Sequence, residues 1–93
     1  MSTEELTVSG NKAVEVAEAL TATSMRILQL LSKERLDITT IGIRLSLSEA
    51  YISEQIKVLE ALKIVNVSYE RGKRGIRKVC QLAIKRIEII ISI

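Results

Sequence analysis

The sequence predicts a small α+β domain that is mainly helical and carries one β-hairpin near its C-terminal end. Three observations predict this class. The chain has 93 residues, which is the size of one domain. Apolar residues recur at helical spacing as far as Leu62, and from Val65 onward they occupy every second position, as in a half-buried strand. Apolar residues make up 47% of the chain and charged residues 27%, which suits a packed core and excludes a disordered chain.

The residue types that are missing argue against most enzyme classes. The sequence has no His, and its single Cys cannot form a thiolate metal site within one chain. Its four glycines fit neither of the glycine-rich nucleotide-binding fingerprints. We therefore expect no enzyme activity, no cofactor, no metal and no evident small-molecule ligand, and we interpret the chain as a binding module.

The hydropathy pattern predicts a cytoplasmic protein without a membrane partner. A membrane-spanning helix needs about 20 apolar residues. The longest unbroken apolar stretch near the C-terminus is 89–91, and the N-terminal segment lacks the charged and apolar regions of a signal peptide.

Charge is unevenly distributed along the chain. Residues 1–70 contain seven basic and ten acidic side chains, whereas residues 71–93 contain seven basic and one acidic. The net charge of residues 71–93 is therefore +6, whereas that of residues 1–70 is −3. A cationic end attracts a polyanion such as nucleic acid or an acidic membrane surface, and the alternative is a solvated surface hairpin.

The spacing of apolar residues predicts four helices, with a short extended piece at 36–38. The first helix is expected from Asn11 to a polar break at 21–24, and the second from that break to about Lys33. The third is expected from Thr39 or Thr40 to Leu45, and the fourth from about Glu49 to Leu62. In the first helix, Val14 and Ala17 form the expected apolar stripe, with Val16 and Leu20 as further candidates. Ser48 is a strong N-cap for the last helix, and Gly42 suggests close approach by another helix.

A β-hairpin follows the last predicted helix. Residues 65–70 and 76–83 are its expected strands, and residues 71–75 form a turn whose glycines absorb positive φ angles. Residues 84–93 are ambiguous, and the spacing of their isoleucines favours a short helix. The expected organisation is a flexible N-terminus at 1–10, a domain at 11–83 and a C-terminal dimerisation segment at 84–93.

Two helices joined by a tight turn form a helix-turn-helix, and the added hairpin makes a winged helix-turn-helix with a three-helix core. Residues 24–31 resemble the second helix of the ArsR- and MarR-like bacterial and archaeal regulators. Residues 52–59, followed by Ile64 and Val65, are similar to their recognition helix and its exit, and residues 71–82 resemble their wing. The resemblance covers about residues 12–83.

The chain departs from this family at two places. Lys63 stands where many members have Gly, and the cysteine cluster of the metal-sensing ArsR relatives has no counterpart. The sequence also resembles small winged-helix proteins of crenarchaea and their viruses, and a viral protein of this kind would act in the host cytoplasm.

The resemblance implies a sequence-specific regulator of transcription that binds double-stranded DNA, with residues 48–62 in the major groove. The candidate base-contacting residues are Ser48, Glu49, Tyr51, Ser53, Glu54, Gln55 and Lys57. The candidates for phosphate or minor-groove contacts are Arg71, Lys73, Arg74, Arg77 and Lys78 in the wing, with Thr39 and Thr40 at a helix N-terminus.

Other interpretations remain open from the sequence. The two glutamates among the base-contacting candidates would repel phosphates if they missed the bases. Tyr51 is as well suited to packing on the helix-turn-helix seam as to contacting DNA. The main alternative function is a winged-helix protein–protein interaction module without DNA binding, followed by binding to duplex RNA.

A homodimer is expected because the first helix and the isoleucine-rich tail carry apolar surface for a second copy. A two-fold dimer with outward wings would bind half-sites about 34 Å apart. Cys80 is by default a small buried residue, but near a two-fold axis it could form an interchain disulfide. The low content of Asn and Gln, five residues in total, suits a thermophile, in which intracellular disulfides occur.

Overall fold

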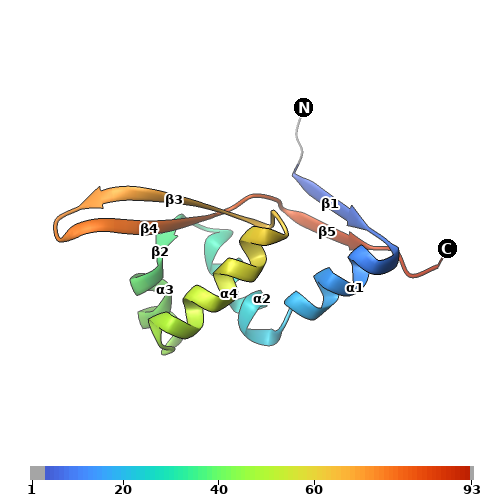
Figure 1. Ribbon diagram of the computed structural model, residues 1–93, viewed down its shortest axis with the longest axis horizontal. Helices are drawn as coiled ribbons and strands as arrows, with labels where there is room; N and C mark the ends of the chain where they lie inside the picture. The colour runs from blue at the N-terminus through green and yellow to red at the C-terminus, as the bar shows by residue number, and fades with distance from the viewer. Residues whose placement is uncertain (1–3, 93) are drawn as a thin grey trace.

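The computed structural model describes residues 4–92. The elements are β1 (Glu5–Val8), α1 (Gly10–Ala19), α2 (Ala22–Leu31), β2 (Leu36–Asp37), α3 (Ile38–Leu45), α4 (Glu49–Ala61), β3 (Val65–Gly72), β4 (Gly75–Leu82) and β5 (Arg86–Ile89). The molecule measures 50 × 31 × 20 Å. The β3–β4 hairpin projects at one end, and the sheet of β1 and β5 lies at the other (Figure 1). The predicted α+β class is confirmed.

The core lies between α2, α3, α4 and the root of the hairpin. Strands β2, β4 and β3 form an antiparallel sheet in that order. The side chains that are fully buried here include Ile27, Ile41, Ile52, Ile56, Leu59 and Ile64. Each such side chain contributes about 1.5–3 kcal/mol through burial. This core fixes the position of α4 relative to the hairpin.

Side-chain caps start three of the helices. Ser48 Oγ accepts a hydrogen bond from the N–H of Tyr51 at 3.1 Å, as predicted for α4. For α3 the prediction was wrong, because the cap is Asp37 rather than Thr39 or Thr40. A carboxylate at this position satisfies a free N–H and also interacts favourably with the positive end of the helix dipole.

The first helix is shifted relative to the prediction. It begins at Gly10 after Ser9, so Asn11 is not its cap. The residues that face inward are Ala13, Val16 and Ala19, whereas Val14 is 57% exposed. The strand that precedes the helix sets its entry into the fold, and the inward face therefore lies one position away from the stripe expected from spacing alone.

The two ends of the chain form a small parallel sheet that the sequence did not predict. In β1 and β5, Leu6 lies opposite Ile87 and Val8 opposite Ile89. The flexible N-terminus is therefore wrong for residues 5–8, and residues 1–3 lie outside the described range. The short helix at 84–93 is also wrong, because residues 86–89 are extended. Leu6, Val8 and Ile87 pack against the side of α1 that carries Val16, and this contact favours the strands.

Two backbone features shape the helix-turn-helix region. Lys63 adopts φ +64°, a left-handed conformation that favours Gly at the end of a helix. A Cβ on Gly42 would lie 2.9 Å from the carbonyl oxygen of Leu47. The close approach predicted at Gly42 therefore exists, but it is made by the turn before α4 and not by another helix. None of the helices in residues 4–92 is long and apolar enough to span a membrane.

Candidate nucleic-acid interface

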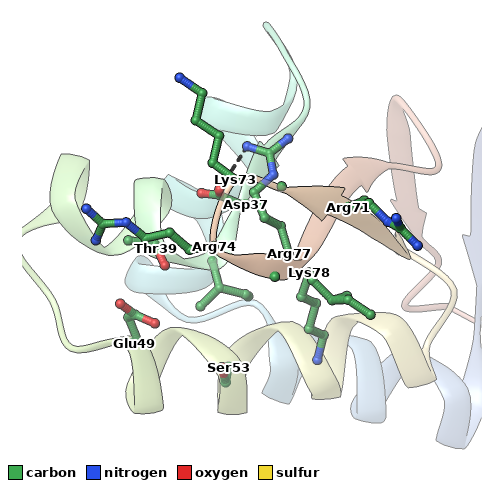
Figure 2. Close-up of a pocket in the computed structure, with 13 residues that line it drawn as sticks. Asp37, Thr39, Glu49, Ser53, Arg71, Lys73, Arg74, Arg77 and Lys78 are labelled. Atoms are coloured by element: carbon green, nitrogen blue, oxygen red, sulfur yellow. Dashed lines mark hydrogen bonds and ion pairs between the residues drawn. The ribbon is translucent and has the colours of Figure 1, made fainter.

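A groove of about 800 Å³ lies between the hairpin and the N-terminal ends of α3 and α4. Its charged and hydroxyl-bearing lining consists of Arg71, Lys73, Arg74, Arg77, Lys78, Asp37, Glu49, Thr39 and Ser53. Figure 2 shows these side chains around the groove, with Lys78 extending from the hairpin toward α4. Five basic side chains against two carboxylates make the groove electropositive, as a polyanion requires.

The hairpin presents its cations because of its register. Strands β3 and β4 pair from Val65–Leu82 to Gly72–Gly75, which leaves Lys73 and Arg74 as a two-residue turn at the tip. Gly75 has φ +114°, a conformation that side chains other than glycine rarely adopt. The predicted glycine-containing turn is therefore present, although the strands extend further toward the tip than expected.

Helix α4 exposes one face of its N-terminal half to solvent. Successive residues are about 100° apart around a helix, and the buried isoleucines of α4 fix its inward side. The outward line then runs through Ala50, Glu54 and Lys57, all exposed, with Glu49 and Ser53 on the side of the groove. Ala50 lies at the centre of this face, and sequence reasoning missed it because a small apolar side chain carries no chemical signal.

Tyr51 lies on the flank of the outward face that is turned away from the groove. Its side chain is 39% exposed. Of the two interpretations left open by the sequence, this exposure favours a contact surface over packing on the helix-turn-helix seam.

Gln55 was predicted to contact bases, but the structure turns it inward. Ser24 Oγ lies 3.1 Å from Gln55 Oε1 and 2.6 Å from the carbonyl oxygen of Ala19. Ser24 is fully buried in α2, so these contacts link α4 to α2. Gln55 therefore supports the position of α4 and does not belong to its exposed face.

The two threonines near the start of α3 differ in what they offer. Thr39 is exposed and lines the groove. The backbone N–H of Thr40 donates to Asp37 Oδ1 at 2.8 Å, so it is not free to bind a phosphate. At this predicted phosphate site, the Thr40 N–H is therefore already bound by a carboxylate of the chain itself, whereas Thr39 stays a candidate.

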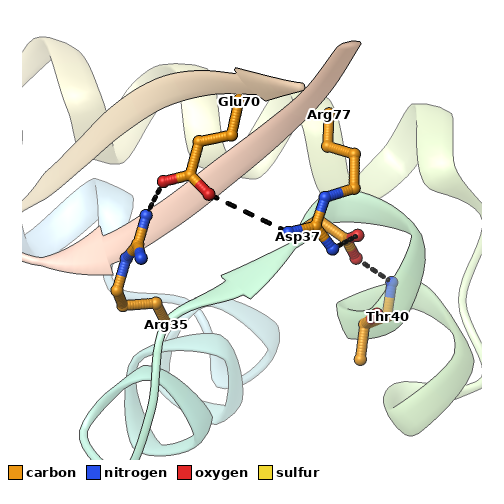
Figure 3. Close-up of polar contacts among 5 residues, drawn as sticks. All are labelled: Arg35, Asp37, Thr40, Glu70 and Arg77. Atoms are coloured by element: carbon orange, nitrogen blue, oxygen red, sulfur yellow. Dashed lines mark hydrogen bonds and ion pairs between the residues drawn. The ribbon is translucent and has the colours of Figure 1, made fainter. Parts of the chain in front are cut away.

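Arg77 was predicted to bind phosphate, but it forms ion pairs within the chain. Its guanidinium lies 3.2 Å from Asp37 Oδ2 and 3.9 Å from Glu70 Oε1, and Glu70 also pairs with Arg35 (Figure 3). We call Arg35, Glu70, Arg77 and Asp37 the Arg77 network. Hydrogen bonds from Thr40 and the charge of Arg77 hold the pKa of Asp37 below its usual value.

The other four basic residues of the hairpin are free within the described part of the chain. They are Arg71, Lys73, Arg74 and Lys78, for which the structure shows no ion pair or hydrogen bond of the side chain. These four cations, rather than the five predicted, are available to phosphates. In residues 4–92, no cluster of three or more His, Cys, Asp or Glu side chains could hold a metal ion.

Cys80 is a free thiol in the middle of the core. It lies in β4 between Leu36 of β2 and Val67 of β3, and its exposed fraction is 0%. Burial raises the pKa of the thiol to about 11. The predicted interchain disulfide is not supported, because a second copy could reach this sulfur only if the central strand left the core.

Comparisons with known proteins place this geometry in context. No protein-family model and no curated protein matches the chain. Solved structures do match it, and these neighbours are winged-helix transcription regulators. The chain has the winged-helix fold.

Three of the structural neighbours come from bacteria. The adhesin competence repressor AdcR of Streptococcus pyogenes is 29% identical (TM-score 0.62), and the match covers 77% of this chain and 55% of AdcR. A C30AH42A mutant of ZitR from Lactococcus lactis is 25% identical (TM-score 0.61), covering 68% of this chain and 42% of ZitR. Reduced HlyU from Vibrio cholerae is 23% identical (TM-score 0.66), covering 78% and 74%.

The coverage limits what these neighbours say about the chain. This chain spans less than two thirds of the length of AdcR and of ZitR, so it matches only a part of each of these proteins. The ArsR- and MarR-like resemblance agrees with the neighbours, whereas the narrower resemblance to crenarchaeal and viral proteins is not supported.

Proposed function

We propose that the chain is a transcription regulator that binds double-stranded DNA with sequence specificity. Helix α4 enters the major groove, and the hairpin contacts phosphates or the adjacent minor groove. The observation that carries this proposal is the electropositive groove that joins the hairpin to the exposed half of α4. The winged-helix neighbours support the regulatory role.

The dimensions and charges of the interface suit duplex DNA. The major groove is about 12 Å wide and admits one helix, whose N-terminal residues then face the base edges. The N-terminal part of α4 is exposed from Glu49 to Tyr51. The four free hairpin cations lie beside this part of α4, where the phosphates that border the major groove of the DNA would lie. Cationic side chains at phosphates supply affinity, and the outward line of α4 supplies sequence preference.

Glu54 is the strongest candidate for a base contact. It is exposed on the outward line of α4, and the structure shows no hydrogen bond or ion pair of its side chain in the described residues. A carboxylate at a DNA-binding surface repels phosphates unless it accepts a hydrogen bond from a base, and cytosine N4 is the usual donor. Ala50, one turn earlier, offers a methyl group to a thymine methyl. We therefore expect a half-site with a cytosine opposite Glu54.

We further propose that two copies act together. The sheet of β1 and β5 lies at the end of the molecule away from the hairpin (Figure 1), and it is followed by Ile90 and Ile91, which are 41% and 91% exposed. A two-fold contact at this end buries apolar surface and leaves both hairpins pointing outward. Such a dimer fits two inverted half-sites about 34 Å apart.

The hairpin cations are tested by fluorescence anisotropy with labelled duplexes at several salt concentrations. The variant K73A/R74A should weaken binding to all duplexes alike. If both side chains meet phosphates, the slope of log K against log salt should become shallower by about 1.8 per chain. Sequence preference should not change, because phosphate contacts carry no sequence information.

The matched control is R26A/K33A, which removes the same number of charges from two exposed residues that do not line the groove and lie outside the β1–β5 sheet. This control should leave the slope unchanged. Equal losses in both variants would mean that only net charge matters, which contradicts a specific interface. Absence of any salt-dependent duplex binding by the wild type would favour the protein–protein module instead.

A further inference from the structure

The Arg77 network joins three segments of the chain, namely residues 35–37 and the two strands of the hairpin. Arg35 precedes β2, Glu70 lies in β3, Arg77 lies in β4, and Asp37 ends β2 and caps α3. Glu70 and Arg77 face each other as cross-strand partners in the hairpin register. Figure 3 shows the resulting chain of contacts from Arg35 through Glu70 and Arg77 to Asp37 and the Thr40 N–H. The network thus connects the hairpin to the start of α3.

The position of the network divides the hairpin into two parts. On the side of Arg77 nearer the body of the domain, the hairpin is packed, with Val79 and Cys80 buried in the core. Beyond it, residues 71–76 project past the body of the domain, and the side chains of Arg71, Lys73 and Arg74 have no partner in the described chain. Arg77 stands at the boundary. Among the described residues, its contacts with Asp37 and Glu70 are the side-chain polar contacts nearest to the tip of the hairpin.

The charges of the network cancel. Two arginines and two carboxylates sum to zero, so the network adds no net charge to the groove. The side chain of Arg77 is 53% exposed, but a phosphate that bound it would compete with two carboxylates for its charge, one of which also caps α3. The side chain of Asp37 is only 13% exposed, which makes this exchange costly compared with binding at the free cations of the tip.

We propose that Arg77 is a positioning residue, which holds the hairpin at a fixed angle to α3 and α4 through Asp37, while Glu70 joins the other strand of the hairpin to Arg35. Since α3 packs directly on α4, this angle sets the distance between the outward face of α4 and the hairpin tip. Both can then engage one duplex at the same time. The inference rests on the proposed DNA-binding function, and it removes Arg77 from the phosphate-contacting set.

Asp37→Asn separates the two possible roles of Arg77. Asn caps a helix as well as Asp does, so α3 keeps its cap while the charge of the ion pair is lost. If Arg77 positions the hairpin, D37N and E70Q should weaken duplex binding about fivefold with an unchanged salt slope. Their hairpin amides, residues 65–82, should also exchange hydrogen more rapidly. If Arg77 instead binds phosphate in the wild type, both variants should bind at least as tightly as the wild type, because they release Arg77 from a competing carboxylate.

Substitutions of Arg77 itself give a second, independent comparison. R77K keeps the charge, but its ammonium is a single point that does not bridge two carboxylates as a guanidinium does. R77K and R77Q should therefore show the same faster amide exchange and the same salt slope as each other. A slope that is shallower by about 0.9 in R77Q alone would overturn the proposal.

The control is E34Q, which breaks the exposed ion pair between Glu34 and Arg44, 3.1 Å apart, with the same change of charge as D37N. It should alter neither hairpin exchange nor affinity. Unchanged exchange in D37N would overturn the positioning role. If the wild type bound no DNA but D37N still loosened the hairpin, the network would stand and the proposed function would fail.

Discussion

At the scale of single residues, Glu54 is the side chain that we propose separates specific from non-specific binding of DNA. It contributes nothing visible to the fold, and near phosphates it costs affinity. Replacing it with Gln should therefore tighten binding to unrelated duplexes. It should also relax the preference for cytosine at one base pair of the site, with a loss of discrimination of about 1–3 kcal/mol.

The measurement compares four duplexes that differ at that base pair, using the wild type, E54Q and E60Q. Glu60 is exposed further along the same helix, so E60Q matches the change in charge without touching the candidate contact. Equal discrimination by E54Q and the wild type would contradict a base contact by Glu54.

Cys80 makes a prediction about alkaline stability. Burial raises its folded-state pKa from 9.0 to about 11, so the neutral thiol stabilises the fold fully below pH 9. As the pH rises from 9 to 11, the unfolded chain loses this proton first, and the free energy of unfolding should fall by about 2–3 kcal/mol. Cys80→Ala lacks this contribution, so its stability should decline less over the same range.

Denaturant unfolding of both proteins at pH 8, 9, 10 and 11 isolates the thiol, because the two proteins differ only at residue 80. Parallel losses of stability would show that Cys80 is accessible to solvent.

At the scale of elements, the sequence predicts well whatever depends on local signals. The N-cap at Ser48, the helical spacing of α4 and the glycine-flanked hairpin are all encoded within about ten residues, and all are confirmed. The β1–β5 sheet is not predictable in this way, since Leu6 and Ile87 meet across nearly the whole chain. Without that pairing, the isoleucines of β5 fit a helix as well as a strand.

In the candidate site too, local features are predictable from the sequence, whereas contacts between distant residues are not. Counting charges correctly locates a cationic hairpin, but Asp37 and Arg77 are 40 residues apart, so their ion pair is invisible to spacing. Similarly, Gln55 lies at the border between the buried and exposed sides of α4. Only its contact with Ser24, from another helix, shows which side it takes.

At the scale of the whole molecule, the shape is that of a rod with different ends. The cationic hairpin occupies one end, and the sheet of β1 and β5 with the exposed isoleucines occupies the other, along a long axis of 50 Å (Figure 1). In the dimer that we propose, two such rods related by a two-fold axis would space their α4 helices along one duplex. The symmetry of the protein then appears as symmetry of the DNA site.

Selection of binding sites from a pool of random duplexes tests DNA recognition most directly. We expect an enriched inverted repeat, with half-site centres about 34 Å apart and a cytosine in each half-site. A pool without any enriched sequence, retained by the protein through charge alone, would contradict sequence-specific recognition by α4.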